Sequence, residues 1–500
     1  MNMLALLFTE KPSHASGQWM VFLGVAMAVM TMWVSSVILF GFSLPLYILF
    51  VLILAAVIFA VPGTGLPIII LSTMWFQRWF TLEPIVLGDV VYKLYPLDVV
   101  FLLTILAFIF HQAFGKERFH LPIHRLESMF LVFFFTCVLY LARSFLDGQA
   151  DQALAVSAFK NYAFYGMLYF LIIYSVRSLV ELKRLLKVLL VGGFGIIGFI
   201  FIGIIRGEGL WTEFNPLSTE GVRLLSFPHA FYLSFVLVLT LVLFVYRLRP
   251  ERVTVLTMWI QLIGLLGSLM RHLWISVFLV TAFLFVVVPK TVKAATARFF
   301  AKNVALLTLA GTFVAFVVIL FPLSDASLTV RDFTQPVYQR ARSLARSTAD
   351  SSARWRIFAW RAARESFTEH ALFGVGYGQD LTIDFETYRV VVPIRDLHNS
   401  LLVLLVQMGM LGFGIFLASL IMIGVRFFDA WKRRGMYWPY QLALFGAWLV
   451  FVAASFWQPY FETNFTGIFF WILLGFLMVS LRLDDENVNL TGLQQPYARP

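Results

Sequence analysis

Long apolar runs recur from near Trp19 to the C-terminal region, and they constrain the fold of this 500-residue chain more than any other feature. Runs of about 17 to 25 apolar residues are long enough to cross the hydrocarbon core of a bilayer as helices. Hydrophobic residues make up 60% of the chain and charged residues only 13%, which is more apolar surface than a soluble domain can bury. The sequence therefore predicts an all-α polytopic integral membrane protein.

We expect about 13 or 14 transmembrane helices. The first run lacks a basic leader and is too long for a cleaved signal, so it is expected to remain as a span. The segment 65–80 has three interpretations: it crosses the membrane, dips in and returns, or lies on the surface. Cys137, the single cysteine, is expected to pack as a small apolar residue. The assigned spans are 19–40, 44–62, 97–114, 127–146, 157–176, 186–206, 227–246, 253–270, 272–289, 303–322, 398–425, 440–458 and 466–482.

Basic residues cluster in alternate short connections, which predicts the orientation of the chain. By the positive-inside rule these connections are cytoplasmic, as is the C-terminal tail. The loop 323–397 then lies outside, in the periplasm if the cell has two membranes. This placement of the net charge of +11 favours a membrane orientation signal over nucleic-acid binding. The basic groups are Lys116, Arg118 and Arg125; Lys183, Arg184 and Lys187; Arg247, Arg249 and Arg252; Lys290, Lys293, Arg298 and Lys302; and Lys432, Arg433 and Arg434.

His398 and Asn399 stand at the expected outer start of a spanning helix, with Gly409, Gly412 and Gly414 further along it. One interpretation is structural: Asn399 caps the helix, His398 reaches toward the interface, and the glycines let a neighbouring helix approach closely. The other is functional, because an ionisable residue at such a place in a membrane protein commonly belongs to a site.

Arginines on the same expected side could complete a site for a multiply charged anion. Arg271 falls at an outward hairpin between two hydrophobic helices, where it is costly unless it meets an anion or a carboxylate. Arg223 and Arg356 lie in outer loops, and convergence of the three with His398 would suit phosphate oxygens, which arginine binds with its planar fork. The chain has no zinc-ligand motif, P-loop or nucleophile elbow, so we expect no metal and no cofactor.

A separate acidic residue, Asp98, follows Pro96 at an expected helix start, where we interpret it as a cap and not as a proton carrier.

The His-Asn pair is followed by nine residues and then G-M-L-G-F-G, which resembles the signature of the O-antigen ligase and polymerase superfamily, with Phe413 in place of a threonine. Upstream, RIFAWRAARESFTEHALFGVGYGQD resembles a loop pattern of that family. Arg356 and Trp360 hold its Arg and Trp places, and its glycine places are held by Gly374, Gly376 and Gly378.

Two further stretches resemble that family, so that the likeness covers residues from roughly 220 to 420. GSLMRHLWIS is similar to a Ser-Arg pair, with two residues inserted between Ser268 and Arg271. RLLSFPHAFY is similar to an Arg-then-Asn-Pro-Asn loop, with Arg223 kept and His229 in place of the final Asn.

The resemblance implies a GT-C-like membrane glycosyltransferase that needs no metal. Such enzymes move a glycan from undecaprenyl diphosphate to a hydroxyl acceptor on the outer side of the bacterial inner membrane. It implies His398 and Arg356 as catalytic residues, and Arg223, Arg271 and Arg354 as diphosphate-binding residues. The expected site-supporting residues are Asn399, Trp360, Gly374, Gly376, Gly378, Gly409 and Gly412. The resemblance also divides the chain into N-terminal helices (1–200), a catalytic core with the large loop (201–430), and C-terminal helices with a tail (431–500).

The acceptor stays open between lipid A–core, for a ligase, and a second lipid-linked repeat unit, for an O-antigen or exopolysaccharide polymerase. Membrane lipids are expected partners and nucleic acid is not. A lipid-linked oligosaccharide flippase is the alternative of another class. It would need cations buried along a central cavity and two related halves, and the sequence shows neither.

Overall fold

The computed structural model describes residues 14–82, 86–87, 90–91, 94–114, 124–206, 225–246, 251–294, 296–298, 301, 338, 342, 351–385 and 388–493. Two compact units are distinguished by their internal packing. The first comprises residues 1–195, 358–441 and 455–500, and the second comprises 196–357 and 442–454. The position of one unit relative to the other is not determined, so each is described by itself.

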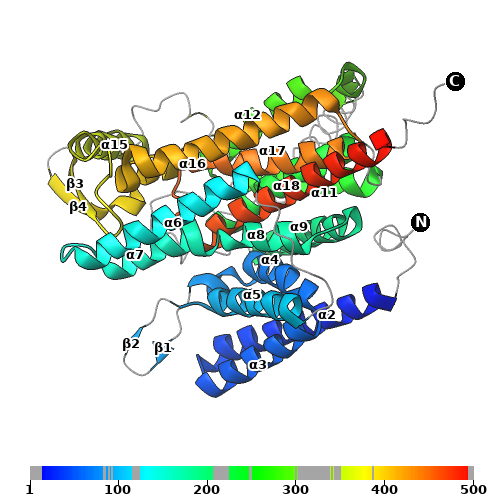
Figure 1. Cartoon of the computed structure of the whole chain (residues 1–500), viewed down its shortest axis with the longest axis horizontal. Helices are drawn as coiled ribbons and strands as arrows, with labels where there is room; N and C mark the ends of the chain where they lie inside the picture. The colour runs from blue at the N-terminus through cyan, green and yellow to red at the C-terminus, as the bar shows by residue number, and fades with distance from the viewer. Residues whose placement is uncertain are drawn as a thin grey trace, which may run out of the picture. The chain divides into compact units, whose positions relative to one another are not determined.

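The described residues are mostly helical (Figure 1). The elements up to residue 206 are α2 (His14–Phe40), α3 (Leu44–Ala60), η1 (Pro62–Thr64), α4 (Gly65–Trp75), η2 (Arg78–Leu82), β1 (Val86–Leu87), β2 (Val90–Val91), α5 (Pro96–Phe114), α6 (Arg125–Leu146), α7 (Gln152–Phe159), η3 (Lys160–Phe164), α8 (Met167–Ser175) and α9 (Leu179–Arg206). The later ones are α10 (Phe227–Val245), α11 (Glu251–Gly267), α12 (Arg271–Val287), α15 (Ser351–Glu369), β3 (Asp380–Phe385), β4 (Tyr388–Pro393), η6 (Ile394–Asp396), α16 (Ser400–Arg433), α17 (Trp438–Ser455) and α18 (Asn464–Leu493).

Nine helices in the described ranges are long and apolar enough to cross a membrane, which confirms a multi-pass membrane protein. Two shorter apolar helices, Val255–Gly267 and Arg271–Val287, stand where two further spans are expected. The expected span 303–322 lies outside the described residues. The nine are Gln18–Phe40, Pro96–Phe114, Arg125–Leu146, Gln152–Ser175, Leu179–Phe201, Phe227–Val245, Ser400–Arg433, Trp438–Ser455 and Asn464–Glu486.

The ambiguous segment 65–80 is a short buried helix that turns back on its predecessor. Helix α4 has 11 residues, so it rises only about 16 Å, half the thickness of the hydrocarbon core. The chain bends by 118° between α3 and the segment Pro62–Trp75. Every residue from Gly65 to Met74 is buried, so the surface interpretation is wrong. The short length and the sharp bend favour a segment that dips in and returns.

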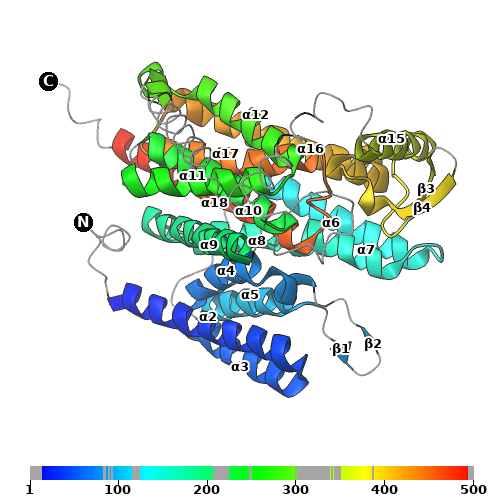
Figure 2. The same cartoon turned by 180° about the vertical axis from the view of Figure 1, so that it is seen from behind.

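The core of the first unit is built around α18, in which every residue from 464 to 481 is buried. A helix that is apolar on all sides belongs in the interior, because it has no polar face to offer to water. Its Trp471 packs edge-on against Phe130 and Phe134 of α6, with ring centroids 5.3 Å apart in both pairs. Both views show α6 alongside α16, and the two helices pack along their length (Figures 1 and 2).

Helix α5 begins with a capping contact, as the sequence predicts. Oδ2 of Asp98 accepts the backbone N–H of Tyr95 at 2.8 Å. The same carboxylate also pairs with Lys160 of η3, which the sequence analysis does not anticipate. Cys137 is fully buried on α6, so its expected role as a small apolar residue is confirmed.

In the second unit, α10 packs against α11 and α12. Glycines allow the close approaches there: a Cβ added to Gly264 would lie 2.3 Å from Ile200 Cδ1, and one added to Gly446 would lie 2.7 Å from Leu284 Cδ1. At the start of α10, His229 is buried, and its Nδ1 lies 2.9 Å from Oγ of Ser226, the N-cap residue.

A β-hairpin, which the sequence analysis does not predict, leads the chain from α15 to α16. Strands β3 and β4 pair antiparallel from Asp380 opposite Pro393 to Phe385 opposite Tyr388. Residues of β3 alternate between exposed and buried, as expected for a sheet with one covered face. The β-branched run of Val390, Val391 and Val392 suits an extended strand. Among the described side chains of α15, Ala359 and Ala363 are buried, and Trp355, Phe358 and Phe367 are half-buried.

Candidate functional site

His398 lies between η6 and α16 in a backbone conformation that side chains seldom adopt. Its φ is +54°, in the left-handed region, which costs a non-glycine residue about 1–2 kcal/mol. The next residue, Asn399, caps α16 by accepting the backbone N–H of Leu402 at 3.1 Å, as the structural interpretation predicts. Strain of this kind persists only where surrounding contacts enforce it, and it is common at functional sites.

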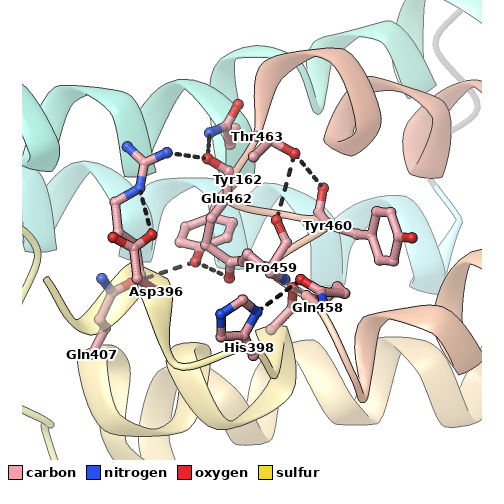
Figure 3. A network of polar contacts seen from close by, with 12 residues as sticks. Tyr162, Asp396, His398, Gln407, Gln458, Pro459, Tyr460, Glu462 and Thr463 are labelled. Carbon is pink, nitrogen blue, oxygen red and sulfur yellow. Dashed lines mark hydrogen bonds and ion pairs between the residues drawn. The ribbon is translucent and has the colours of Figure 1, made fainter. Parts of the chain in front are cut away.

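One contact fixes the orientation of the His398 ring. Nδ1 lies 2.8 Å from Oε1 of Gln458 in the connection between α17 and α18 (Figure 3). An amide oxygen only accepts hydrogen bonds, so Nδ1 carries the hydrogen. A neutral ring then has its lone pair on Nε2, which is the arrangement of a general base. The side chain is half-buried.

Ser400, two residues beyond His398, contacts the same connection at three points. Its Oγ lies 2.5 Å from Oε2 of Glu462 and 3.2 Å from the backbone oxygen of Gln458. It also accepts the backbone N–H of Phe461 at 3.2 Å. The first turn of α16 is thereby joined to residues 458–462.

Glu462 is a buried carboxyl, 4% exposed, that the sequence analysis does not single out. Its Oε1 accepts the hydroxyl hydrogen of Tyr162 at 2.9 Å. Burial raises the pKa of Glu462 from 4.5 to about 7, although the hydrogen bonds from Ser400 and Tyr162 and the charge of Arg395 act in the opposite direction. Its backbone oxygen accepts from Asn161 Nδ2 at 2.8 Å and from Arg395 Nη2 at 3.2 Å.

A small pocket adjoins Glu462 and is lined also by Arg395, Gln407 and Gln379. Its volume of about 10 Å³ is that of a single water molecule, so it is too small for a sugar.

The glycine-rich turn 374–378 is docked on an interruption of α16. Gly409 has φ +61° and ψ −167°, a conformation that breaks the helix and is open essentially to glycine alone. The backbone N–H groups of Met410 and Leu411 donate to the carbonyl oxygens of Ala371 and Leu372, at 2.8 and 3.1 Å. These bonds to the turn replace the helical bonds that the break removes.

Gly409 and Gly374 allow two backbone segments to approach closely, which differs from the helix packing of the structural interpretation. A Cβ added to Gly409 would lie 2.4 Å from Leu372 O, and one added to Gly374 would lie 2.5 Å from Val406 O. A Cβ on Gly412 would meet the side chain of Met408 in its own helix, and one on Gly414 would meet nothing within 4 Å. The prediction that these glycines form a seam for a neighbouring helix is therefore wrong at Gly409.

Helix α6 holds this turn in place from the other side. The hydroxyl of Tyr140 lies 2.7 Å from Phe373 O and 2.8 Å from Met408 O, so it joins the turn to α16. Arg143 Nη1 donates to Gly374 O at 3.2 Å. Tyr140 and Arg143 are three residues apart, so they lie on one face of α6.

The last glycine of the turn, Gly378, lies against the connection between α6 and α7. Its carbonyl accepts the N–H of Asp151 at 2.8 Å, and a Cβ at this position would lie 2.3 Å from Asp151 O. On the other side of the site, Trp360 of α15 donates from Nε1 to the carbonyl of Leu397 at 3.0 Å, next to His398. The first unit thus brings Trp360, His398, Asn399 and the glycines into one connected assembly.

None of the predicted arginines falls within the described residues of the first unit. Arg223 is outside the described residues. Arg271, half-buried, is the first residue of α12, and Arg354 and Arg356 lie on the part of α15 that belongs to the second unit. Because the two units are not placed relative to each other, convergence of these arginines with His398 stays a prediction. Within its own unit, Arg271 puts a positive charge at a helix N-terminus, which favours an anion nearby.

No group of three or more His, Cys, Asp or Glu side chains suited to a metal occurs within the described ranges.

Comparison with known families supports the sequence motifs. Residues 256–417 match the model of a family described as O-antigen ligase, which confirms the predicted resemblance. The matched segment contains Arg271, Arg356, His398 and the glycines of the turn, whereas Arg223 precedes it and Glu462 follows it. No curated protein shows a significant match to the chain.

Proposed function

The chain is a multi-pass membrane protein that carries an O-antigen ligase domain at residues 256–417, and from this premise we propose that it is a glycosyltransferase of cell-surface polysaccharide synthesis. The proposed donor is a glycan on undecaprenyl diphosphate, and the proposed acceptor is a hydroxyl of lipid A–core. The reaction takes place on the periplasmic side of the inner membrane. The observation that supports this most is the His398 ring, held through Nδ1 by Gln458 at the N-terminus of α16.

In the proposed reaction Nε2 of His398 takes the proton of the acceptor hydroxyl as its oxygen attacks the anomeric carbon. The bond from that carbon to the diphosphate oxygen breaks, and the electron pair leaves with undecaprenyl diphosphate. The hydrogen bond from Nδ1 to Gln458 holds the ring in the tautomer that can accept this proton. General base catalysis of this kind contributes a factor of about 10² to 10⁴ in rate.

Fixed arginines would stabilise the leaving diphosphate. Negative charge grows on its oxygens as the glycosidic bond breaks, and preorganised guanidinium groups favour that charge without a metal ion. Arg223, Arg271 and Arg354 are proposed for this role, with Arg356 acting at the reacting centre beside His398.

The test is a glycan gel from a deletion strain complemented with wild type, His398→Ala or Arg356→Ala. The matched control is His370→Ala, because His370 is an exposed histidine whose Nδ1 lies 3.2 Å from the backbone oxygen of Ser366. A blot of the membrane fraction checks that each variant is inserted. We expect the control to restore the long glycan and the other two variants to lose it.

The product that accumulates identifies the acceptor. Full-length lipid-linked polymer means that a ligase has been lost, whereas single lipid-linked repeat units mean that a polymerase has been lost. If His398→Ala and Arg356→Ala both restore wild-type glycan, the His-Asn helix start is structural and the proposed mechanism is wrong.

A further inference from the structure

We propose that Gln458 and Glu462 are positioning residues for His398, Gln458 through the imidazole ring and Glu462 through the helix turn that carries it. The proposal rests on the proposed function, because it is the transfer reaction that requires the ring to be held. Both residues lie in the connection 456–463 between α17 and α18, beyond the segment that matches the O-antigen ligase family.

Gln458 determines which nitrogen of the ring can accept a proton. With Oε1 at 2.8 Å from Nδ1, the hydrogen of the neutral ring is held on Nδ1. Without that acceptor the ring loses one of the contacts that favour a hydrogen on Nδ1.

Glu462 joins the helix turn to a second helix. Its two carboxyl oxygens take different partners: Oε2 meets Ser400 of α16 at 2.5 Å, and Oε1 meets Tyr162 of η3 at 2.9 Å. The backbone oxygen of Glu462 is fixed in turn by Asn161 and Arg395. This carboxyl therefore sets the place of Ser400, two residues from His398.

The protonation state of Glu462 decides where the Ser400 hydroxyl donates. An ionised carboxylate only accepts, so Ser400 must give its hydrogen to Oε2. A protonated carboxyl can instead donate to Ser400 Oγ, which releases the serine hydrogen for the backbone oxygen of Gln458, 3.2 Å away. Ionisation of Glu462 thus removes a hydrogen bond from the residue that holds the His398 ring.

Other charged or titratable groups face this arrangement. Arg395 and Asp396 lie on η6, with Arg395 Nε 3.7 Å from Asp396 Oδ1. Burial raises the pKa of Asp396, while the charges of Arg395 and His398 act to lower it. From η3 comes Tyr162, whose hydroxyl is already bonded to Glu462.

The first experiment measures the His398 ring without relying on activity. Purified protein in lipid nanodiscs is treated with diethyl pyrocarbonate, which modifies unprotonated imidazole, and the label at each histidine is quantified by mass spectrometry between pH 5.5 and 8.5. Gln458→Leu removes the acceptor, and Glu462→Gln keeps the shape of the protonated acid. The exposed His370 is the internal standard.

For Gln458→Leu we expect the labelling rate of His398 relative to His370 to rise about fivefold, the factor that corresponds to one net hydrogen bond. For Glu462→Gln we expect the pH profile of His398 labelling to follow a single titration. Wild type should show a second step, because ionisation of Glu462 changes the bonds around Ser400. If both variants show the labelling rate and the pH profile of wild-type His398, the proposal is overturned.

The second experiment separates this proposal from the function on which it rests. The same variants are tested for long glycan in the complemented deletion strain, where we expect Gln458→Leu to lower its amount about tenfold or more. If wild type restores no glycan while the labelling differences persist, the proposed function fails and the positioning of His398 stands. If glycan levels depend on His398 but neither variant changes the labelling, the function stands and the positioning roles fail.

Discussion

His398 and Leu269 both hold their backbones in the left-handed region, with φ of +54° and +57°. His398 is a residue that the sequence motifs select for chemistry, and Leu269 stands two residues before another, Arg271. Such conformations cost about 1–2 kcal/mol each, so the surrounding structure must enforce them. Both residues lie in stretches that the sequence motifs single out, whereas Arg434, with φ of +46°, is the C-cap of α16.

Glu462 gives a residue-scale prediction about stability and pH. Its pKa is raised from 4.5 to about 7 on folding, so the protonated form favours the folded state. Its contribution is complete below about pH 4.5 and is lost as the pH rises through about 7. The shift corresponds to about 3 kcal/mol, as an order of magnitude.

Glu462→Gln removes this loss because glutamine does not ionise. Thermal unfolding of the detergent-solubilised protein gives the difference in melting temperature between the variant and wild type. We expect this difference to favour the variant more at pH 8 than at pH 5. Glu365→Gln, at an exposed position of α15, serves as the control and should show no such change. If the melting temperature of Glu462→Gln differs from that of wild type by the same amount at both pH values, the raised pKa of Glu462 is contradicted.

At the scale of elements, the break in α16 explains why a glycine-rich turn is needed so close to His398. Gly409 interrupts the helix, and the turn that contains Gly374 supplies the missing backbone partners. Tyr140 and Arg143 of α6 then hold that turn. Two segments distant in sequence, the turn and α6, thereby fix the first turns of α16, on which His398 depends.

Alanine substitutions at two glycines of α16 test this arrangement. Gly409→Ala would place a Cβ 2.4 Å from Leu372 O in a conformation suited to glycine, so we expect a loss of more than about 2 kcal/mol in unfolding free energy. Gly414→Ala meets open space inside a helix, and we expect a gain of about 0.5–1 kcal/mol. Thermal unfolding in detergent measures both, and similar destabilisation by the two changes rules out a special role for the break.

At the scale of the whole molecule, nine candidate spans within the described residues confirm a multi-pass membrane protein. Orientation remains a prediction from the basic connections, in which the β-hairpin lies outside and the connection after α16 lies inside. The native cysteine is fully buried, which suits labelling of introduced cysteines.

Cysteine labelling in intact spheroplasts tests that orientation. Val391→Cys, at a 62% exposed position of β4, is expected to react with a membrane-impermeant maleimide. Lys432→Cys, exposed at the other end of α16, is expected to react only after the membrane is opened. The reverse pattern would invert the topology and place His398 on the cytoplasmic side.

The features that depend on local chemistry could be predicted from the sequence alone. Apolar runs long enough to cross a bilayer predict helices, because a helix satisfies the hydrogen bonds of its own backbone in lipid. The capping roles of Asn399 and Asp98 were also predictable, since a cap depends on neighbours three residues away. The His-Asn and glycine motifs pointed to the family whose model matches residues 256–417, because their spacing is present in the sequence itself.

Contacts between segments far apart in sequence became apparent only in the folded structure. Gln458 and Glu462 sit in an ordinary-looking connection, and nothing in FWQPYFET indicates that it meets His398 and Ser400, about 60 residues earlier. The predicted role of Gly409 was wrong, because helix packing and backbone docking both require glycine. Only its contact with the backbone of Leu372 distinguishes the two. The dip of α4 depends likewise on burial among neighbouring helices, since its apolar composition suits a span, a dip or a surface helix equally.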